Sequence, residues 1–232
     1  MIFYYSTVIC AAAALCIFLF FRVKKELFKA IFFKAITSFL FMACAVFAFV
    51  AGKQSVFGYF PALVILGLLC GLFGDLWLDL KNIHPEAKDT YQYIGMGSFL
   101  SSHLFFVPAL FLISGKNVWQ MLLGIGIGVL FAAGVMLFEK PMKVRYGKFK
   151  LITFFYSLTI GASTGYSVIA FIKSGFSMQP MFLMIGMALV LISDIILSGT
   201  YFGEGKDRPV DIVSNHALYY IGQFFIASSL LF

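Results

Sequence analysis

Three aspartates interrupt otherwise apolar stretches of the sequence and are the first candidates for chemistry. Asp75 and Asp79 lie one helical turn apart within residues 63–80, and Asp194 lies within residues 181–197. A carboxylate inside a bilayer is costly, so such residues are typical of functional sites. Acids that share a partly dry cavity cannot all ionise easily, and one can hold a proton while another stays charged. That pairing suits hydrolysis through an oxocarbenium-like cation, in which the acid protonates, the carboxylate stabilises positive charge, and water attacks.

A second set of polar side chains follows one face of the last apolar segment. His216, Tyr219, Tyr220 and Gln223 recur at helical spacings of three, four and seven residues. Tyrosines near a membrane surface are often interfacial anchors. Gln223 lies deeper, where an anchoring role does not explain it, so we predict that this face lines a polar site.

Other catalytic chemistries have weaker support. No nucleophilic-serine motif is present, because Gly95-Met96-Gly97-Ser98 does not fit the required spacing. A zinc site built from His103, His216 and acids is neither supported nor excluded, since the histidines belong to different helices. The four cysteines lack metal-ligand spacing and are interpreted as small apolar packing residues. We therefore assign no metal and no other cofactor.

The composition is that of a membrane protein. Of the 232 residues, 62% are hydrophobic and 12% are charged, whereas soluble domains carry about 25% charged residues. A helix needs roughly 20 mostly apolar residues to cross the hydrocarbon core. We predict an all-α, single-domain bundle of eight transmembrane helices, over approximately residues 3–21, 32–51, 59–80, 93–114, 119–138, 149–172, 181–201 and 213–232.

The positions of the basic residues predict the orientation of this bundle. Most of the 17 lysines and arginines lie around the first, third, fifth and seventh connections, Lys34 and Lys81 among them, whereas Lys53, Lys116 and Lys173 stand alone in the others. The positive-inside rule then places the odd-numbered connections in the cytoplasm and both termini outside. Phospholipid headgroups suffice to explain the net charge of +7, so we expect no nucleic-acid partner.

Similar local sequences recur about half a chain length apart. Asp75 and Asp194 each follow a small residue and precede a leucine by three positions, and His103 and His216 follow Ser102 and Asn215. This recurrence suggests two parallel four-helix halves. In that arrangement the polar groups converge in the cytoplasmic half of the bundle, which implies a cavity open to the cytoplasm or the inner leaflet.

At these positions the chain resembles the YhhN-like family, the lysoplasmalogenases. The resemblance rests on residues 71–78 (Gly-Leu-Phe-Gly-Asp-Leu-Trp-Leu), Phe99 with His103, Ser193 with Asp194, and Tyr219-Tyr220 with Gln223. It covers essentially the whole chain and implies an eight-helix membrane enzyme. The implied reaction is hydrolysis of the vinyl ether bond of a lysoplasmalogen, which yields a fatty aldehyde and a glycerophospho-headgroup.

The resemblance also frames the expected residue roles. We expect Asp75 and Asp194 to share the acid and stabilising-base roles in either order. The other polar groups would position water or glycerol, or tune the acid pair, although Asp79 lies near Lys81 and a solvated charge is the alternative for it. The candidate catalytic residues are Asp75, Asp194 and His103, and the candidate substrate-binding residues are Asp79, Ser193, His216, Tyr219, Tyr220 and Gln223.

The main alternative is a proton-coupled transporter or a lipid-binding membrane protein, because intramembrane acids and parallel repeats also occur in transporters. Transport requires access from both sides, and the outer half of this bundle has few polar residues, which favours a one-sided enzyme. A purely structural role is disfavoured by three acids at a similar depth. The expected location is the cytoplasmic membrane of a bacterium or an internal membrane, such as the endoplasmic reticulum, of a eukaryotic cell.

Overall fold

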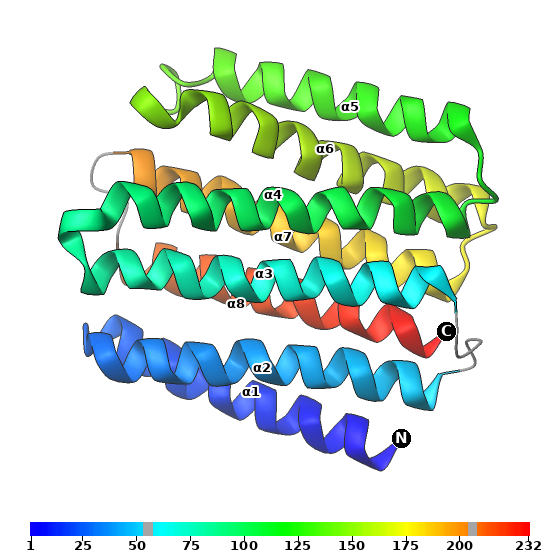
Figure 1. Cartoon of the computed structure of the whole chain (residues 1–232), viewed down its shortest axis with the longest axis horizontal. Coiled ribbons are helices and arrows are strands. Elements are labelled where there is room, and N and C mark those ends of the chain that lie inside the picture. The colour runs from blue at the N-terminus through cyan, green and yellow to red at the C-terminus, as the bar shows by residue number, and fades with distance from the viewer. Residues whose placement is uncertain (53–57, 204–207) are drawn as a thin grey trace.

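A computed structural model of the chain describes residues 1–52, 58–203 and 208–232. The described chain is almost entirely helical, as predicted, and its long helices run side by side (Figure 1). Short 3-10 turns precede α4 and α6 and follow α8, namely η1 (Pro85–Ala87), η2 (Gly147–Phe149) and η3 (Ser229–Leu231). The eight helices are α1 (Ile2–Val23), α2 (Leu27–Ala51), α3 (Tyr59–Ile83), α4 (Lys88–Ile113), α5 (Val118–Leu137), α6 (Lys150–Lys173), α7 (Met178–Phe202) and α8 (Pro209–Ser228).

Seven of the described helices, α1 to α7, are long and apolar enough to cross a membrane. The α8 helix matches α5 in length, at 20 residues, but carries the polar face predicted from the sequence. It begins at Pro209, four residues earlier than predicted, because proline is well suited to the first helical turn. Since α8 packs against α1, α2, α3 and α7, most of its polar face is covered by protein. The chain is thus a multi-pass helical membrane protein.

The helices pack as four hairpins whose arrangement repeats. The pairs α1–α2 and α3–α4 correspond to α5–α6 and α7–α8. The contacts of α2 with α3 and α8 recur as contacts of α6 with α7 and α4, and the α1–α8 contact recurs as α5–α4. In addition, α3 and α7 both contain 25 residues, and Asp75 and Asp194 occupy the same position counted from the first residue of each. The packing therefore supports the two parallel halves suggested by the sequence.

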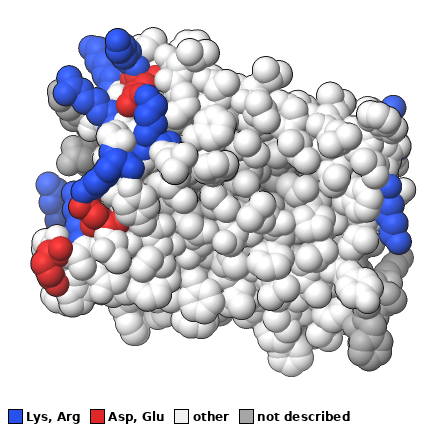
Figure 2. Space-filling model, turned by 45° about the horizontal axis from the view of Figure 1, so that its top comes forward, with Lys and Arg blue, Asp and Glu red and all other residues white. Residues whose placement is uncertain are grey.

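Charged side chains gather at one end of the bundle, and the surface between the two ends is almost uncharged (Figure 2). The first and last residues of the chain lie at the opposite end (Figure 1). The positive-inside rule predicts that the basic end faces the cytoplasm. Two assignments were wrong: Lys34 and Lys81 are buried residues of α2 and α3 rather than loop charges. The α2 helix begins at Leu27, so Lys34 lies two turns inside it.

Glycines allow the closest contact between α5 and α6. A Cβ atom at Gly128 would lie 2.4 Å from the carbonyl oxygen of Leu158, whereas one at Gly126 would have no neighbour within 4 Å. Small residues at such crossings let the backbones of membrane helices approach closely. Gly128 therefore lies at the close crossing of α5 and α6, and Gly126 does not.

Gly128→Ala is expected to lower the thermal unfolding midpoint in detergent, because the added methyl group meets backbone that cannot rotate away. Overpacking of this kind costs about 1–3 kcal/mol. Gly126→Ala is the matched control on the same helix and is expected to leave the midpoint unchanged or slightly higher. Equal midpoints for the two variants would contradict the packing described here.

Candidate active site

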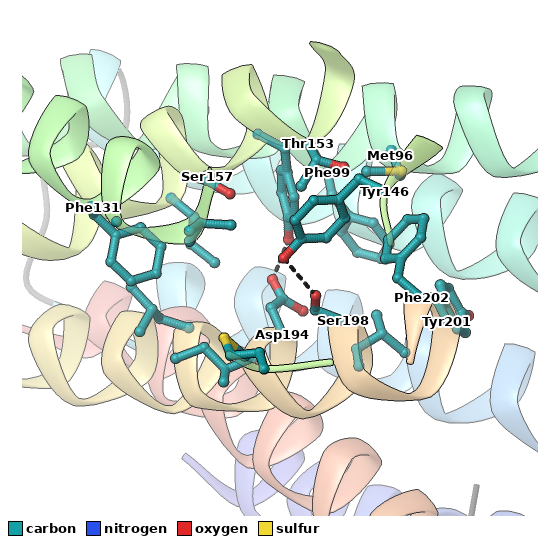
Figure 3. Close-up of a pocket in the computed structure, with 18 of the residues that line it drawn as sticks. Met96, Phe99, Phe131, Tyr146, Thr153, Ser157, Asp194, Ser198, Tyr201 and Phe202 are labelled. Carbon is teal, nitrogen blue, oxygen red and sulfur yellow. Dashed lines mark hydrogen bonds between the residues drawn. The ribbon is translucent and has the colours of Figure 1, made fainter. Parts of the chain in front are cut away.

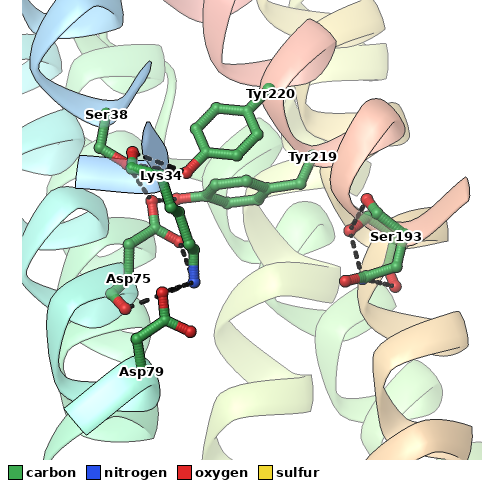
Figure 4. A network of polar contacts seen from close by, with 8 residues as sticks. Lys34, Ser38, Asp75, Asp79, Ser193, Tyr219 and Tyr220 are labelled. Carbon is green, nitrogen blue, oxygen red and sulfur yellow. Dashed lines mark hydrogen bonds and ion pairs between the residues drawn. The ribbon is translucent and has the colours of Figure 1, made fainter. Parts of the chain in front are cut away.

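Asp75 and Asp79 share one buried lysine. The Nζ atom of Lys34 lies 3.5 Å from Oδ1 of Asp75 and 3.2 Å from Oδ2 of Asp79 (Figure 4). The three residues are 4–5% exposed. A buried ion requires a partner because its desolvation costs several kcal/mol. With both acids ionised, one lysine balances only one of the two negative charges.

Hydroxyl groups from two other helices bind the second oxygen of Asp75. Oδ2 accepts hydrogen bonds from Ser38 Oγ on α2, at 2.8 Å, and from the Tyr219 hydroxyl on α8, at 3.1 Å. The Tyr220 hydroxyl lies 2.9 Å from Ser38 Oγ. This Asp75 cluster (Lys34, Ser38, Asp75, Asp79, Tyr219 and Tyr220) joins α2, α3 and α8, so Asp75, Asp79 and both tyrosines do come together.

Asp194 has different surroundings. Its Oδ2 accepts a hydrogen bond from the hydroxyl of Tyr156 on α6, and the carboxyl lines a cavity of about 410 Å³ (Figure 3). The wall contains a few hydroxyl groups, including those of Thr153 and Ser157. The remaining wall is mostly apolar, with Leu78, Met96, Phe99, Leu130, Phe131, Val135, Phe138, Ile160, Leu191, Ile195 and Phe202. Asp194 is only partly buried and lines this cavity. Asp75 is buried and does not line it.

Aromatic rings connect the two acids. Phe99 has its ring centroid 5.9 Å from that of Tyr219 and 6.5 Å from that of Tyr156. No hydrogen bond between described residues joins Asp75 directly to Asp194, and the rings of Tyr219, Phe99 and Tyr156 lie in sequence between them. The two acids of the expected pair therefore have different surroundings, and aromatic contacts link one to the other.

The connection between α5 and α6 contributes Met142 and Tyr146 to the wall of this cavity. The Glu139 carboxylate lies 2.8 Å from Lys150 Nζ and accepts a hydrogen bond from the backbone amide of Tyr146 at 3.0 Å. Both contacts favour the charged form and hold the pKa of Glu139 below its usual range. The hydroxyl oxygen of Tyr146 in turn lies 3.2 Å from Oγ of Ser198 on α7. The Glu139 contacts thus fix one wall residue of the cavity.

The remaining predicted residues are more dispersed. His103 is buried with Nδ1 2.8 Å from Ser163 Oγ, and its ring centroid is 6.0 Å from that of Tyr156. Ser193 is hydrogen-bonded to Asn215, which joins α7 to α8. His216 packs on Phe18, and the buried Oε1 of Gln223 accepts no hydrogen bond in the described part of the chain.

A comparison with protein families places this arrangement in context. The model of the YhhN family matches residues 29–230. The chain belongs to the YhhN family. No curated protein and no solved structure matched the chain. The matched range includes Lys34, Asp75 and Asp194, so the contacts described above lie within the part of the chain that the family model covers.

Sequence reasoning missed three residues of this candidate site. Lys34 and Ser38 lie one turn apart on α2, and both face Asp75. That polar pair within an apolar segment was the available signal. Tyr156 follows two phenylalanines in an apolar segment and was therefore overlooked, although the residue after it, Ser157, is polar. The described residues contain no group of three or more His, Cys, Asp or Glu side chains placed to hold a metal ion.

Lys34→Met is expected to destabilise the YhhN protein strongly, because two buried carboxylates lose their cation. Breaking a buried ion pair from one side costs about 3–5 kcal/mol. Adding Asp79→Asn should recover part of that loss. The measurement is the unfolding midpoint in detergent for the single and double variants.

Lys29→Met is the control, since Lys29 forms an exposed ion pair with Glu26 whose contribution is about 1 kcal/mol or less. If Lys34→Met and Lys29→Met were equally mild, the buried cluster would not hold the helices as described.

Proposed function

We propose that this YhhN protein hydrolyses the vinyl ether bond of lysoplasmalogens and releases a fatty aldehyde and a glycerophospho-headgroup. The host membrane would be the cytoplasmic membrane of a bacterium or an internal membrane of a eukaryotic cell. The observation that carries the proposal is the Asp194 carboxyl, hydrogen-bonded to Tyr156, in the wall of a mostly apolar cavity. Such a cavity suits a hydrocarbon chain and brings its first carbons to an acid. Family membership is consistent with this reaction.

In the proposed reaction, Asp194 begins in its protonated form and transfers its proton to the vinyl carbon farther from the ether oxygen. The carbon–carbon double bond supplies the electron pair, and the carbon attached to oxygen becomes an oxocarbenium ion. Water adds to that carbon and returns a proton to the Asp194 carboxylate. The hemiacetal then breaks its bond to the glycerol oxygen, which takes up the hydroxyl proton as the aldehyde forms. Positioned acid–base groups typically contribute 10²- to 10⁴-fold.

The Asp75 cluster has a supporting role in this proposal. When both acids are ionised, its two acids and one lysine carry a net negative charge. Phe99 and Tyr219 lie between this charge and Tyr156, the partner of Asp194. A fixed negative charge near a developing cation lowers the barrier without being transferred. Asp194 therefore acts as the proton donor, and Asp75 provides electrostatic stabilisation.

The test is aldehyde release from lysoplasmenylethanolamine by the purified full chain, beside an ester-linked lysophospholipid. We expect aldehyde from the vinyl ether lipid, no cleavage of the ester lipid, and a loss of at least about 10²-fold in Asp194→Asn. Asp89→Asn removes an exposed carboxylate at the same end and should retain full activity. Full activity of folded Asp194→Asn would overturn the proposal.

The transporter alternative makes a different prediction. An inactive but folded wild-type protein that carries protons across liposomes would favour it. We expect no such flux, because the cavity beside Asp194 is lined by the portions of its helices that lie toward the basic end of the bundle.

Tyr156→Phe is expected to lower kcat by about tenfold or more and to change KM little. The phenol holds the Asp194 carboxyl in place, and the ring that contacts the hydrocarbon remains. Steady-state kinetics in mixed micelles would measure the split. A large rise in KM with unchanged kcat would instead assign Tyr156 to substrate binding alone.

A further inference from the structure

A second cavity, of about 390 Å³, lies at the basic end of the bundle. The ends of α1, α3 and α7 and the starts of α2 and α4 form its walls, together with Ile212 of α8. Unlike the apolar cavity, it is lined by four cations and several neutral hydrogen-bonding groups. We call this set the basic cavity, and its polar lining residues are Arg22, Lys25, Lys81, Asn82, Lys88, Gln92, Thr200 and Tyr201.

The cations of the basic cavity lack carboxylate partners in the described chain. Elsewhere, Lys29, Lys34, Lys148, Lys150 and Arg208 each form an ion pair with an acid. Arg22, Lys25, Lys81 and Lys88 form none with the described residues. Lys81 is only 8% exposed, and it lies over the ring of Tyr201, 3.1 Å from the centroid. A buried ammonium group with no carboxylate partner among the described residues indicates an anionic ligand, since buried charges otherwise carry a large desolvation cost.

Headgroup attraction at the membrane surface does not account for this arrangement. Exposed lysines suffice for that purpose and do not have to line a cavity. In the basic cavity, Lys81 is held inside the bundle and Gln92 is 4% exposed. Cations combined with neutral N–H donors are the groups that bind phosphate oxygens.

Tyr201 joins the basic cavity to the apolar one, because it lines both. On α7, Asp194, Ser198 and Tyr201 follow at spacings of four and three residues, so they share one helical face. Asp194 and Tyr201 are separated by about 10 Å along the helix axis. A lysophospholipid has a similar order of parts: a hydrocarbon chain, a glycerol linked through oxygen, and then a phosphate.

We propose that the basic cavity binds the phosphodiester of the lysophospholipid while the chain occupies the apolar cavity, so that the bond to be cleaved lies beside Asp194. This inference rests on the proposed function and adds a requirement for phosphate. The neutral donors Asn82 and Gln92 would share the phosphate oxygens with the four cations. A glycerol ether without phosphate would lack this anchor.

Equilibrium binding tests this without catalysis. The probe is a saturated 1-O-alkyl lysophosphoethanolamine, which has no vinyl ether to cleave. It is compared with the 1-O-alkylglycerol that carries the same alkyl chain and with inorganic phosphate. The full-length wild-type chain in detergent should bind the phospholipid at least tenfold more tightly than the alkylglycerol. The double variant Arg22→Gln/Lys88→Gln should lose at least tenfold for the phospholipid and nothing for the alkylglycerol, which also shows that it is folded.

The matched control is Lys24→Gln/Lys140→Gln, which removes two positive charges near the same end but outside the basic cavity. It should bind the phospholipid as the wild type does. Equal losses in both double variants, or equal wild-type affinities for phospholipid and alkylglycerol, would overturn the phosphate site. Inorganic phosphate binding as tightly as the phospholipid would overturn the lipid assignment in favour of a free anion. Retained phospholipid selectivity in a chain that releases no aldehyde would remove the proposed reaction and leave the binding site.

Discussion

The cost of placing charge inside an apolar helical bundle governs the arrangement of this protein. Asp75 and Asp79 are tolerated because Lys34 lies between them and because Ser38 and Tyr219 donate to Asp75. These partners come from α2 and α8, so the same contacts that stabilise the acids on α3 also fix α2, α3 and α8 relative to one another. A buried polar network is favourable only when its members are satisfied together. The architecture around Asp75 follows from that condition.

The two halves of the bundle show how one repeated acid acquires two roles. Ser38 and Ser157 are separated by the same interval as Asp75 and Asp194, and so are Lys34 and Thr153. The first half therefore carries a cation where the second half carries a neutral threonine. In the second half, the space beside the acid is an apolar cavity, and Tyr156 is its hydrogen-bond partner. Asp75 is consequently enclosed as a charge, whereas Asp194 meets the space in which a lipid chain would lie.

The sequence predicted the helical architecture well because hydropathy and the alternation of basic residues report directly on membrane crossing. Helical spacing likewise predicted the polar face of α8, from which Tyr219 and Tyr220 join the Asp75 cluster. Lys34 was misassigned because a lysine near the edge of an apolar window looks like its boundary, and only the helix start at Leu27 places it inside. The separate settings of Asp75 and Asp194 could not be predicted, since they depend on which side chains of α2, α5 and α6 fill the space beside each acid. Periodicity within one helix does not contain that information.

Transfer of a proton to carbon is the central step of this account, and the product can record it. The measurement is hydrolysis of lysoplasmenylethanolamine in D₂O, with immediate reduction of the aldehyde to prevent later exchange and mass spectrometry of the resulting alcohol. The account predicts one deuterium atom at the carbon next to the former aldehyde carbon, and loss of the labelled product in Asp194→Asn. Aldehyde released without deuterium at that carbon would contradict the protonation mechanism.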